Sequence, residues 1–209
     1  PIPIPGIMMK NCLWILAACV AWVYPLVAQD IHTAKEVTYL TDPEKELIRL
    51  VNEVRTQPAA FAKKYLESRQ NEGSYARECY QELLTWAPLK PLQPSLALSL
   101  AAKDHAIDMG TSGQIGHAST KGESSADRVK RHGNFTGTYN GPWENCSYGF
   151  EDPLAIILQL LIDDGVPSRG HRKNIMQPAV NFIGVSIQPH KGYRFNCVMD
   201  LADAVEDKK

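Results

Sequence analysis

The sequence predicts an α+β domain, and three patterns support this prediction. Apolar residues recur at helical spacing through the first half of the chain, and residues 153–162 form an apolar run of helical length. Near the C-terminus, apolar and polar residues alternate on both sides of a short turn, which is typical of a β-hairpin. The chain has 209 residues, of which 44% are hydrophobic and 22% charged, which is enough to fill one core. We therefore expect one domain.

Residues 1–28 are interpreted as a signal peptide with an upstream extension. Lys10 supplies the positive charge, residues 12–27 are apolar, and Leu26-Val27-Ala28 precedes a plausible cleavage site. The protein is then secreted, as a periplasmic or extracellular protein, with no stable membrane insertion after cleavage. The alternative is a lipoprotein anchored through Cys19, which ends the lipobox-like segment 16–19. The apolar residues after Cys19 favour secretion, because a lipid anchor needs a polar tether behind it.

Charge and cysteine content limit the partners and the crosslinks. Without residues 1–28 the chain has 21 basic and 23 acidic residues, a net charge of −2, and no basic stripe, so we expect no nucleic-acid partner. Cys79, Cys146 and Cys197 remain, which allows one disulfide and one free thiol. A disulfide, if one forms, is expected between Cys146 and Cys197, because both lie in predicted strands whereas Cys79 lies in a helix.

The helices follow a short lead-in at residues 29–41. Asp42, Pro43 and Glu44 resemble an N-cap, a first-turn proline and a first-turn acid, and apolar residues at helical spacing follow them. Further helices are expected from Pro58 through Tyr65, over 75–84, from Pro94 to the loop around 113–116, over 125–132 and over 153–162.

The strands are expected mainly near the C-terminus. Residues 183–187 alternate, His190-Lys191-Gly192 turns the chain, and residues 193–199 alternate again. A further strand carries Glu144 and Cys146 on one face and Asn145 on the other. We expect residues 133–142 to form a loop and residues 204–209 a charged tail.

Two histidines and one glutamate stand at equal intervals. His117 and Glu144 are 27 residues apart, as are Glu144 and His171, so these side chains meet only through tertiary structure. Imidazole nitrogen and carboxylate oxygen are common zinc ligands and also handle protons. These residues are therefore the first candidates for a functional site.

The order of the motifs resembles that of the CAP family (cysteine-rich secretory, antigen 5 and pathogenesis-related proteins) in its bacterial SCP-domain branch. The resemblance rests on residues 116–119, Glu144-Asn145, residues 170–175 and Gly184-Val185, and extends over a domain at 42–203. It implies a three-layer α-β-α sandwich with a small antiparallel sheet. It also implies a surface cavity lined by two histidines and two acidic residues.

The resemblance assigns roles to individual residues. His117 and His171 match the cavity histidines, through which zinc or another divalent metal is implied, and Glu144 matches one acid. The second acid is expected at Asp163 or Asp164.

The remaining polar residues near these motifs are interpreted structurally. Asn145 and Asn174 are expected to brace the backbone, and Arg172 to pair with Asp163 or Asp164. We expect His105 to be a hydrogen-bonded core residue, and His32, His132 and His190 to lie at the surface or in turns.

Three functions fit these residues. The favoured one is a binding module for a small ligand or cell-envelope component, namely a lipid, a peptide or a cell-wall fragment. A metal-assisted hydrolase with Glu144 as general base is one alternative. A hydrolase with Cys146 as nucleophile and His171 or His190 as base is another, acting on peptide or cell-wall substrates. The Gly-x-Ser-x-Gly and His-Glu-x-x-His signatures are missing from the sequence.

Overall fold

The computed structural model describes residues 30–208 of the chain. The expected signal peptide and the alternative anchor at Cys19 lie outside these residues. Within the described part, none of the helices has the length and apolar character needed to cross a membrane.

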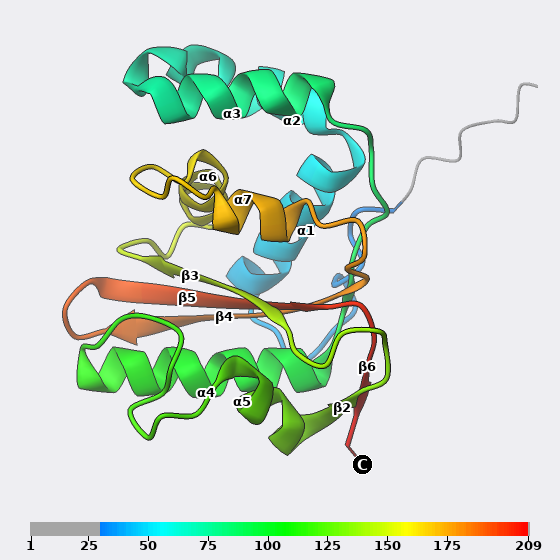
Figure 1. The fold of residues 1–209 in the computed structure, drawn as a ribbon, viewed down its shortest axis with the longest axis vertical. Helices are drawn as coiled ribbons and strands as arrows, with labels where there is room; N and C mark the ends of the chain where they lie inside the picture. The colour runs from blue at the N-terminus through cyan, green and yellow to red at the C-terminus, as the bar shows by residue number, and fades with distance from the viewer. Residues whose placement is uncertain (1–29, 209) are drawn as a thin grey trace, which may run out of the picture.

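The described residues form three layers, with a sheet between two groups of helices (Figure 1). α4 and α5 cover one face of the sheet, and α1, α6 and α7 cover the other, with α2 and α3 stacked beyond them. This arrangement confirms the expected α-β-α sandwich. The helices, including one 3₁₀ helix (η1), are α1 (Asp42–Thr56), α2 (Pro58–Tyr65), η1 (Glu67–Glu72), α3 (Ser74–Thr85), α4 (Leu96–Ser112), α5 (Ser125–His132), α6 (Pro153–Ile162) and α7 (Gly170–Ile175).

The central sheet has the strand order β1-β4-β5-β3. β4 and β5 form the predicted hairpin, β3 pairs antiparallel with β5, and β1 pairs parallel with β4. β3 therefore lies at one edge of the sheet. The strands are β1 (Gln93–Pro94), β2 (Gly133–Phe135), β3 (Trp143–Tyr148), β4 (Phe182–His190), β5 (Arg194–Ala202) and β6 (Val205–Asp207).

Local sequence sets the helix ends. Thr41 caps α1 in a reciprocal capping box with Glu44, so the cap lies one residue before the predicted Asp42. Ser95 caps α4 through a hydrogen bond from the backbone N–H of Leu98. The prediction that Pro94 starts this helix was wrong, because Pro94 belongs to β1. α5 and α6 have the predicted bounds.

Two predictions about the C-terminal half need correction. Residues 133–142 are not entirely loop, because Gly133–Phe135 forms β2 and pairs antiparallel with β6, which lies in the expected tail. The expected pairing of Cys146 with Cys197 was also wrong, since the three cysteines of the described residues are free. In the β3–β5 register Cys146 lies opposite Val198 and Cys197 opposite Ser147, so the two thiols point to opposite faces.

The sheet contacts α4 very closely at Gly184. A Cβ atom at this position would lie 2.2 Å from the backbone of Leu98 and Ser99, so only glycine fits there. This close contact fixes α4, and with it His105, against the sheet beneath β3.

Candidate functional site

The edge strand β3 supplies the centre of the candidate site. Successive side chains of a strand point to opposite faces, so Glu144 and Cys146 face α4 whereas Asn145 faces α6 and α7. The Glu-Asn pair thus contacts segments on both sides of the sheet.

On the α4 side, Glu144 binds His117 and Arg128. His117 Nδ1 lies 2.8 Å from Glu144 Oε1, and the guanidinium of Arg128 donates to Oε2. Arg128 is 1% exposed and also donates to the carbonyl oxygens of His117 and Glu123. The arginine therefore neutralises a buried carboxylate and also fixes the loop that carries His117.

On the other side, Asp163 holds His171. Asp163 Oδ1 lies 2.6 Å from His171 Nδ1, and Oδ2 accepts the backbone N–H of His171 at 3.0 Å. Asp163 is buried and has a left-handed backbone with φ 56° at the C-terminus of α6. Of the two acids considered for the fourth position, Asp163 makes these contacts and the exposed Asp164 does not.

Asn145 links His171 to the strand. Its side-chain amide donates to the carbonyl of His171 at 3.1 Å, and its Oδ1 accepts from Asn174 at 2.9 Å. Asn145 and Asn174 therefore brace the backbone in the way expected from the sequence. His171 itself lies in the first turn of α7.

One predicted ion pair differs from the structure. Arg172 pairs with Glu78 and Glu82 of α3 rather than with Asp163 or Asp164, because its side chain extends away from the cavity. His190 lies at the predicted hairpin turn, where its side chain is buried and its Nδ1 accepts the backbone N–H groups of Gly192 and Tyr193.

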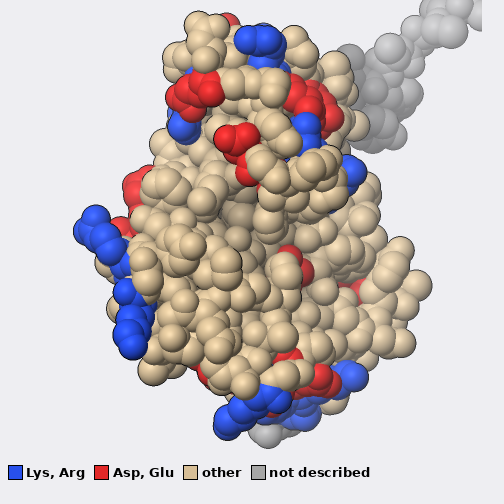
Figure 2. All heavy atoms as spheres, turned by 60° about the vertical axis from the view of Figure 1, so that its left-hand side comes forward, with Lys and Arg blue, Asp and Glu red and all other residues tan. Residues whose placement is uncertain are grey.

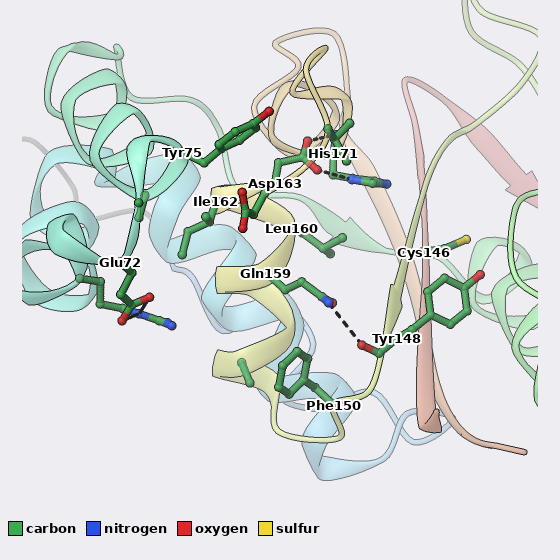
Figure 3. A pocket seen from close by; sticks show the side chains of 16 residues that line it. Glu72, Tyr75, Cys146, Tyr148, Phe150, Gln159, Leu160, Ile162, Asp163 and His171 are labelled. Carbon is green, nitrogen blue, oxygen red and sulfur yellow. Dashed lines mark hydrogen bonds and ion pairs between the residues drawn. The ribbon is translucent and has the colours of Figure 1, made fainter. Parts of the chain in front are cut away.

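A cavity of about 460 Å³ lies between α3, α6 and the outer edge of β3. Figure 3 shows His171 and Asp163 at one wall and Tyr148 and Phe150 at another. His117 does not line this cavity, but its Nδ1 lies 3.8 Å from Cys146 Sγ, and Cys146 does line it. The surface around the hollow is mostly uncharged (Figure 2).

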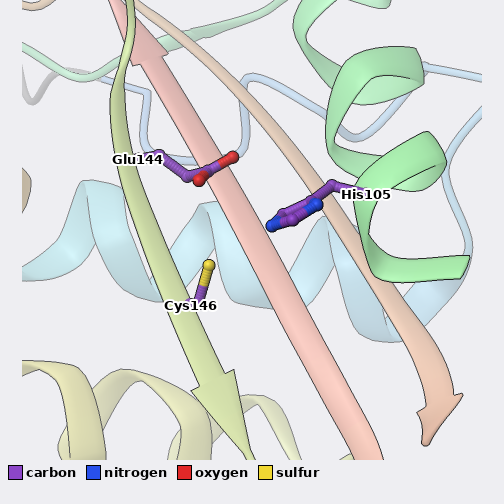
Figure 4. A group of neighbouring side chains, drawn as sticks. All are labelled: His105, Glu144 and Cys146. Carbon is purple, nitrogen blue, oxygen red and sulfur yellow. The ribbon is translucent and has the colours of Figure 1, made fainter. Parts of the chain in front are cut away.

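A second group of potential ligands lies behind Glu144. Atoms of His105, Glu144 and Cys146 lie within 4.8 Å of one another, so this group could hold a metal ion (Figure 4). His105 is buried as predicted, and its Nε2–H donates to the carbonyl of Gly116. Asp200, opposite Glu144 in the sheet, is fully buried.

The electrostatics differ between these groups. Burial would raise the pKa of Glu144, but the hydrogen bond from His117 and the charge of Arg128 outweigh it and lower the pKa. The bond to Glu144 raises the pKa of His117. Burial and the charge of Glu144 hold the pKa of Asp200 well above its ordinary value. Burial likewise raises the pKa of the Cys146 thiol, with Glu144 and Asp200 adding to the effect.

Sequence reasoning missed Arg128 and Asp200. An acid inside the apolar run of β5 is a detectable signal, because carboxylates are rarely buried without a partner. Arg128 carries no such signal, since arginine is common on exposed helix faces.

Two solved structures are similar to parts of this chain. An SCP-domain extracellular protein from Bacillus anthracis matches with 20% identity and a TM-score of 0.50, over 77% of this chain and 40% of that one. This chain thus spans less than half of that protein. An outer surface protein from Borrelia burgdorferi matches with 17% identity and a TM-score of 0.44, over 71% of this chain and 93% of that one.

The comparison with protein families shows the family of this chain. A search of curated proteins gave no match. The model of the cysteine-rich secretory protein (CAP) family, in contrast, matches residues 48–201, from α1 to the end of β5. The chain therefore belongs to the CAP family.

Proposed function

We propose that this protein is a secreted binding module whose cavity beside β3 takes a small ligand, with a divalent metal ion held by His117 and His171. The ligand class is a lipid, a peptide or a cell-wall fragment. The observation that supports the proposal best is the presence of two carboxylate–histidine pairs, one on each side of β3, next to a cavity of about 460 Å³.

The hydrogen bonds favour metal binding by both histidines. A carboxylate only accepts hydrogen bonds, so Glu144 and Asp163 fix the proton of each neutral ring on Nδ1. The Nε2 atom of each ring then keeps its lone pair. Metal-binding histidines commonly have this arrangement, with the second ring nitrogen bound to a carboxylate. The residues therefore fit a zinc ion or another divalent ion, which would act as a Lewis acid when bound.

Calorimetric titration of zinc tests the metal. We expect His117→Ala and His171→Ala each to lose most of the affinity, because one imidazole is an incomplete site. His105→Ala is the matched control and should retain the affinity while destabilising the core. Unchanged affinity in both cavity variants, with folding verified by circular dichroism, would contradict the metal proposal.

Amide chemical shifts test the ligand cavity. Three soluble probes represent the ligand classes: decanoate, a tripeptide and muramyl dipeptide. We expect at least one probe to shift the amides of Cys146, Leu160 and His171, which line the cavity. Ala155→Trp should abolish these shifts by filling the cavity, whereas Ala87→Trp, in another groove, should not. If none of the probes shifts these amides, the binding proposal fails.

Export is supported by the Lys10 and 12–27 pattern and by the extracellular neighbour from Bacillus anthracis. The intact mass of the secreted protein should correspond to cleavage near Ala28. A mass that begins at acylated Cys19 would instead establish the lipoprotein.

A metal-assisted hydrolase with Glu144 as general base is the second candidate, because Asp163 orients His171 toward the cavity as a carboxylate orients a metal-binding histidine. The thiol alternative has less support. A reactive cysteine needs a lowered pKa, whereas burial raises the pKa of Cys146.

A further inference from the structure

The outer edge of β3 is open to a backbone partner at its centre. The N–H of Gly149, just after β3, donates to the carbonyl of Phe195, which continues the register beyond Tyr148 and Asn196. Odd-numbered residues of β3 therefore direct their backbone groups toward β5. Glu144, Cys146 and Tyr148 therefore direct their N–H and C=O groups away from the sheet.

Side-chain amides cover both ends of this edge. The carbonyl of Glu144 accepts from Asn174 at 3.4 Å, and the carbonyl of Tyr148 accepts from Gln159 at 3.3 Å. Between them, the backbone N–H and C=O of Cys146 have no hydrogen-bond partner among the described residues. The strand at Cys146 and Tyr148 borders the cavity, and the side chains of both residues point away from it (Figure 3). The backbone itself thus forms this wall.

We propose that the cavity binds an extended peptide segment, which pairs with Cys146 as an additional strand at the edge of β3. This inference rests on the proposed binding function and names its ligand class. A second peptide backbone supplies a donor and an acceptor at the spacing that Cys146 presents, as in other cases of strand addition. An acyl chain supplies neither group.

The same geometry limits the length and character of the segment. Asn174 and Gln159 already bind the carbonyls of Glu144 and Tyr148. A peptide can therefore pair through both backbone groups only with Cys146, while Glu144 and Tyr148 can offer it only their N–H groups. Ala155 and Leu160 of α6 form an apolar wall opposite the strand. A short segment with an apolar side chain directed at α6 fits this space, and His171 lies beside its backbone.

A pool of random hexapeptides, acetylated and amidated at their ends, tests the proposal against the full secreted chain. We expect immobilised wild type and Ala87→Trp to enrich the same peptides, and Ala155→Trp to enrich none. The best peptide is then remade with one N-methyl group at each position in turn. Strand pairing predicts a loss of about tenfold in affinity at one N-methyl position only, because the carbonyl of Cys146 is the one carbonyl along this edge that Asn174 and Gln159 leave free to accept a peptide N–H.

The outcomes separate this inference from the proposed function. Failure to enrich any peptide, or equal sensitivity at all N-methyl positions, would overturn the strand-addition proposal. If decanoate or muramyl dipeptide still shifts the cavity amides in that case, the binding function stands and only the peptide class is wrong. If no probe and no peptide binds, both proposals fail.

Discussion

The two carboxylate–histidine pairs hold similar imidazoles by different means. Glu144 and His117 are 27 residues apart, and a buried arginine from a third segment completes their contact. Asp163 and His171 are eight residues apart, and a single left-handed residue at the end of α6 brings them together. The first pair therefore depends on tertiary folding and charge balance, and the second on local backbone geometry.

The largest expected effect tests this charge balance. Replacing Arg128 with leucine leaves Glu144 buried beside Asp200 without its cation, and we expect a loss of about 3–5 kcal/mol in the free energy of unfolding. Urea denaturation followed by circular dichroism measures this change.

A double variant serves as its control. Arg128→Leu with Glu144→Leu removes both charges and should recover part of the loss, because the main penalty comes from the unpaired carboxylate. Equal stability of the single and double variants would show that packing of the arginine, rather than its charge, is responsible.

The second prediction concerns backbone geometry at Asp163. Asp163→Ala removes two hydrogen bonds and places a residue without a local side-chain acceptor at φ 56°, which should destabilise the fold by about 2–4 kcal/mol. Asp163→Asn should lose less, because asparagine tolerates the left-handed region and still accepts a hydrogen bond. Thermal unfolding of both variants decides this, and a larger loss for asparagine would contradict the geometric explanation.

The difference between the pairs also explains how much of the site the sequence could predict. His117, Glu144 and His171 were identified from motifs that follow one another along the chain in the order typical of the CAP family. The choice between Asp163 and Asp164 was not possible, because it depends on a backbone angle that no residue pattern near 163 indicates. Arg128 was missed since its role arises only when α5 packs against α4 and the guanidinium reaches Glu144.

The fold shows the same division. Long periodic segments such as α6 and the β4–β5 hairpin were predicted closely because periodicity needs several residues to be visible. β1, β2 and β6 have two or three residues each, too few for any period. α7 was also missed, because it has six residues and follows the left-handed Arg169 without a side-chain cap.

The smallest expected effect concerns the pH dependence of stability, which should have opposite signs for two histidines on the α4 side of the sheet. Burial lowers the pKa of His105 against the opposing charge of Glu144, whereas the hydrogen bond to Glu144 raises the pKa of His117. The stability contributed by neutral His105 is therefore full above the unfolded pKa of about 6.5 and is lost as the pH falls through the folded value. The contribution of His117 has the opposite sign: it is full below about 6.5 and is lost as the pH rises through its raised folded pKa.

Urea denaturation of His105→Gln and His117→Gln between pH 5 and 8, a range around the ordinary imidazole value of about 6.5, tests these signs. The stability difference from wild type should shrink with falling pH for His105→Gln and grow for His117→Gln. If the stability difference from wild type changes with pH in the same direction in both variants, Glu144 does not act on the pKa values of the two histidines in the expected way. The contact between Glu144 and His117 would then be held by packing alone.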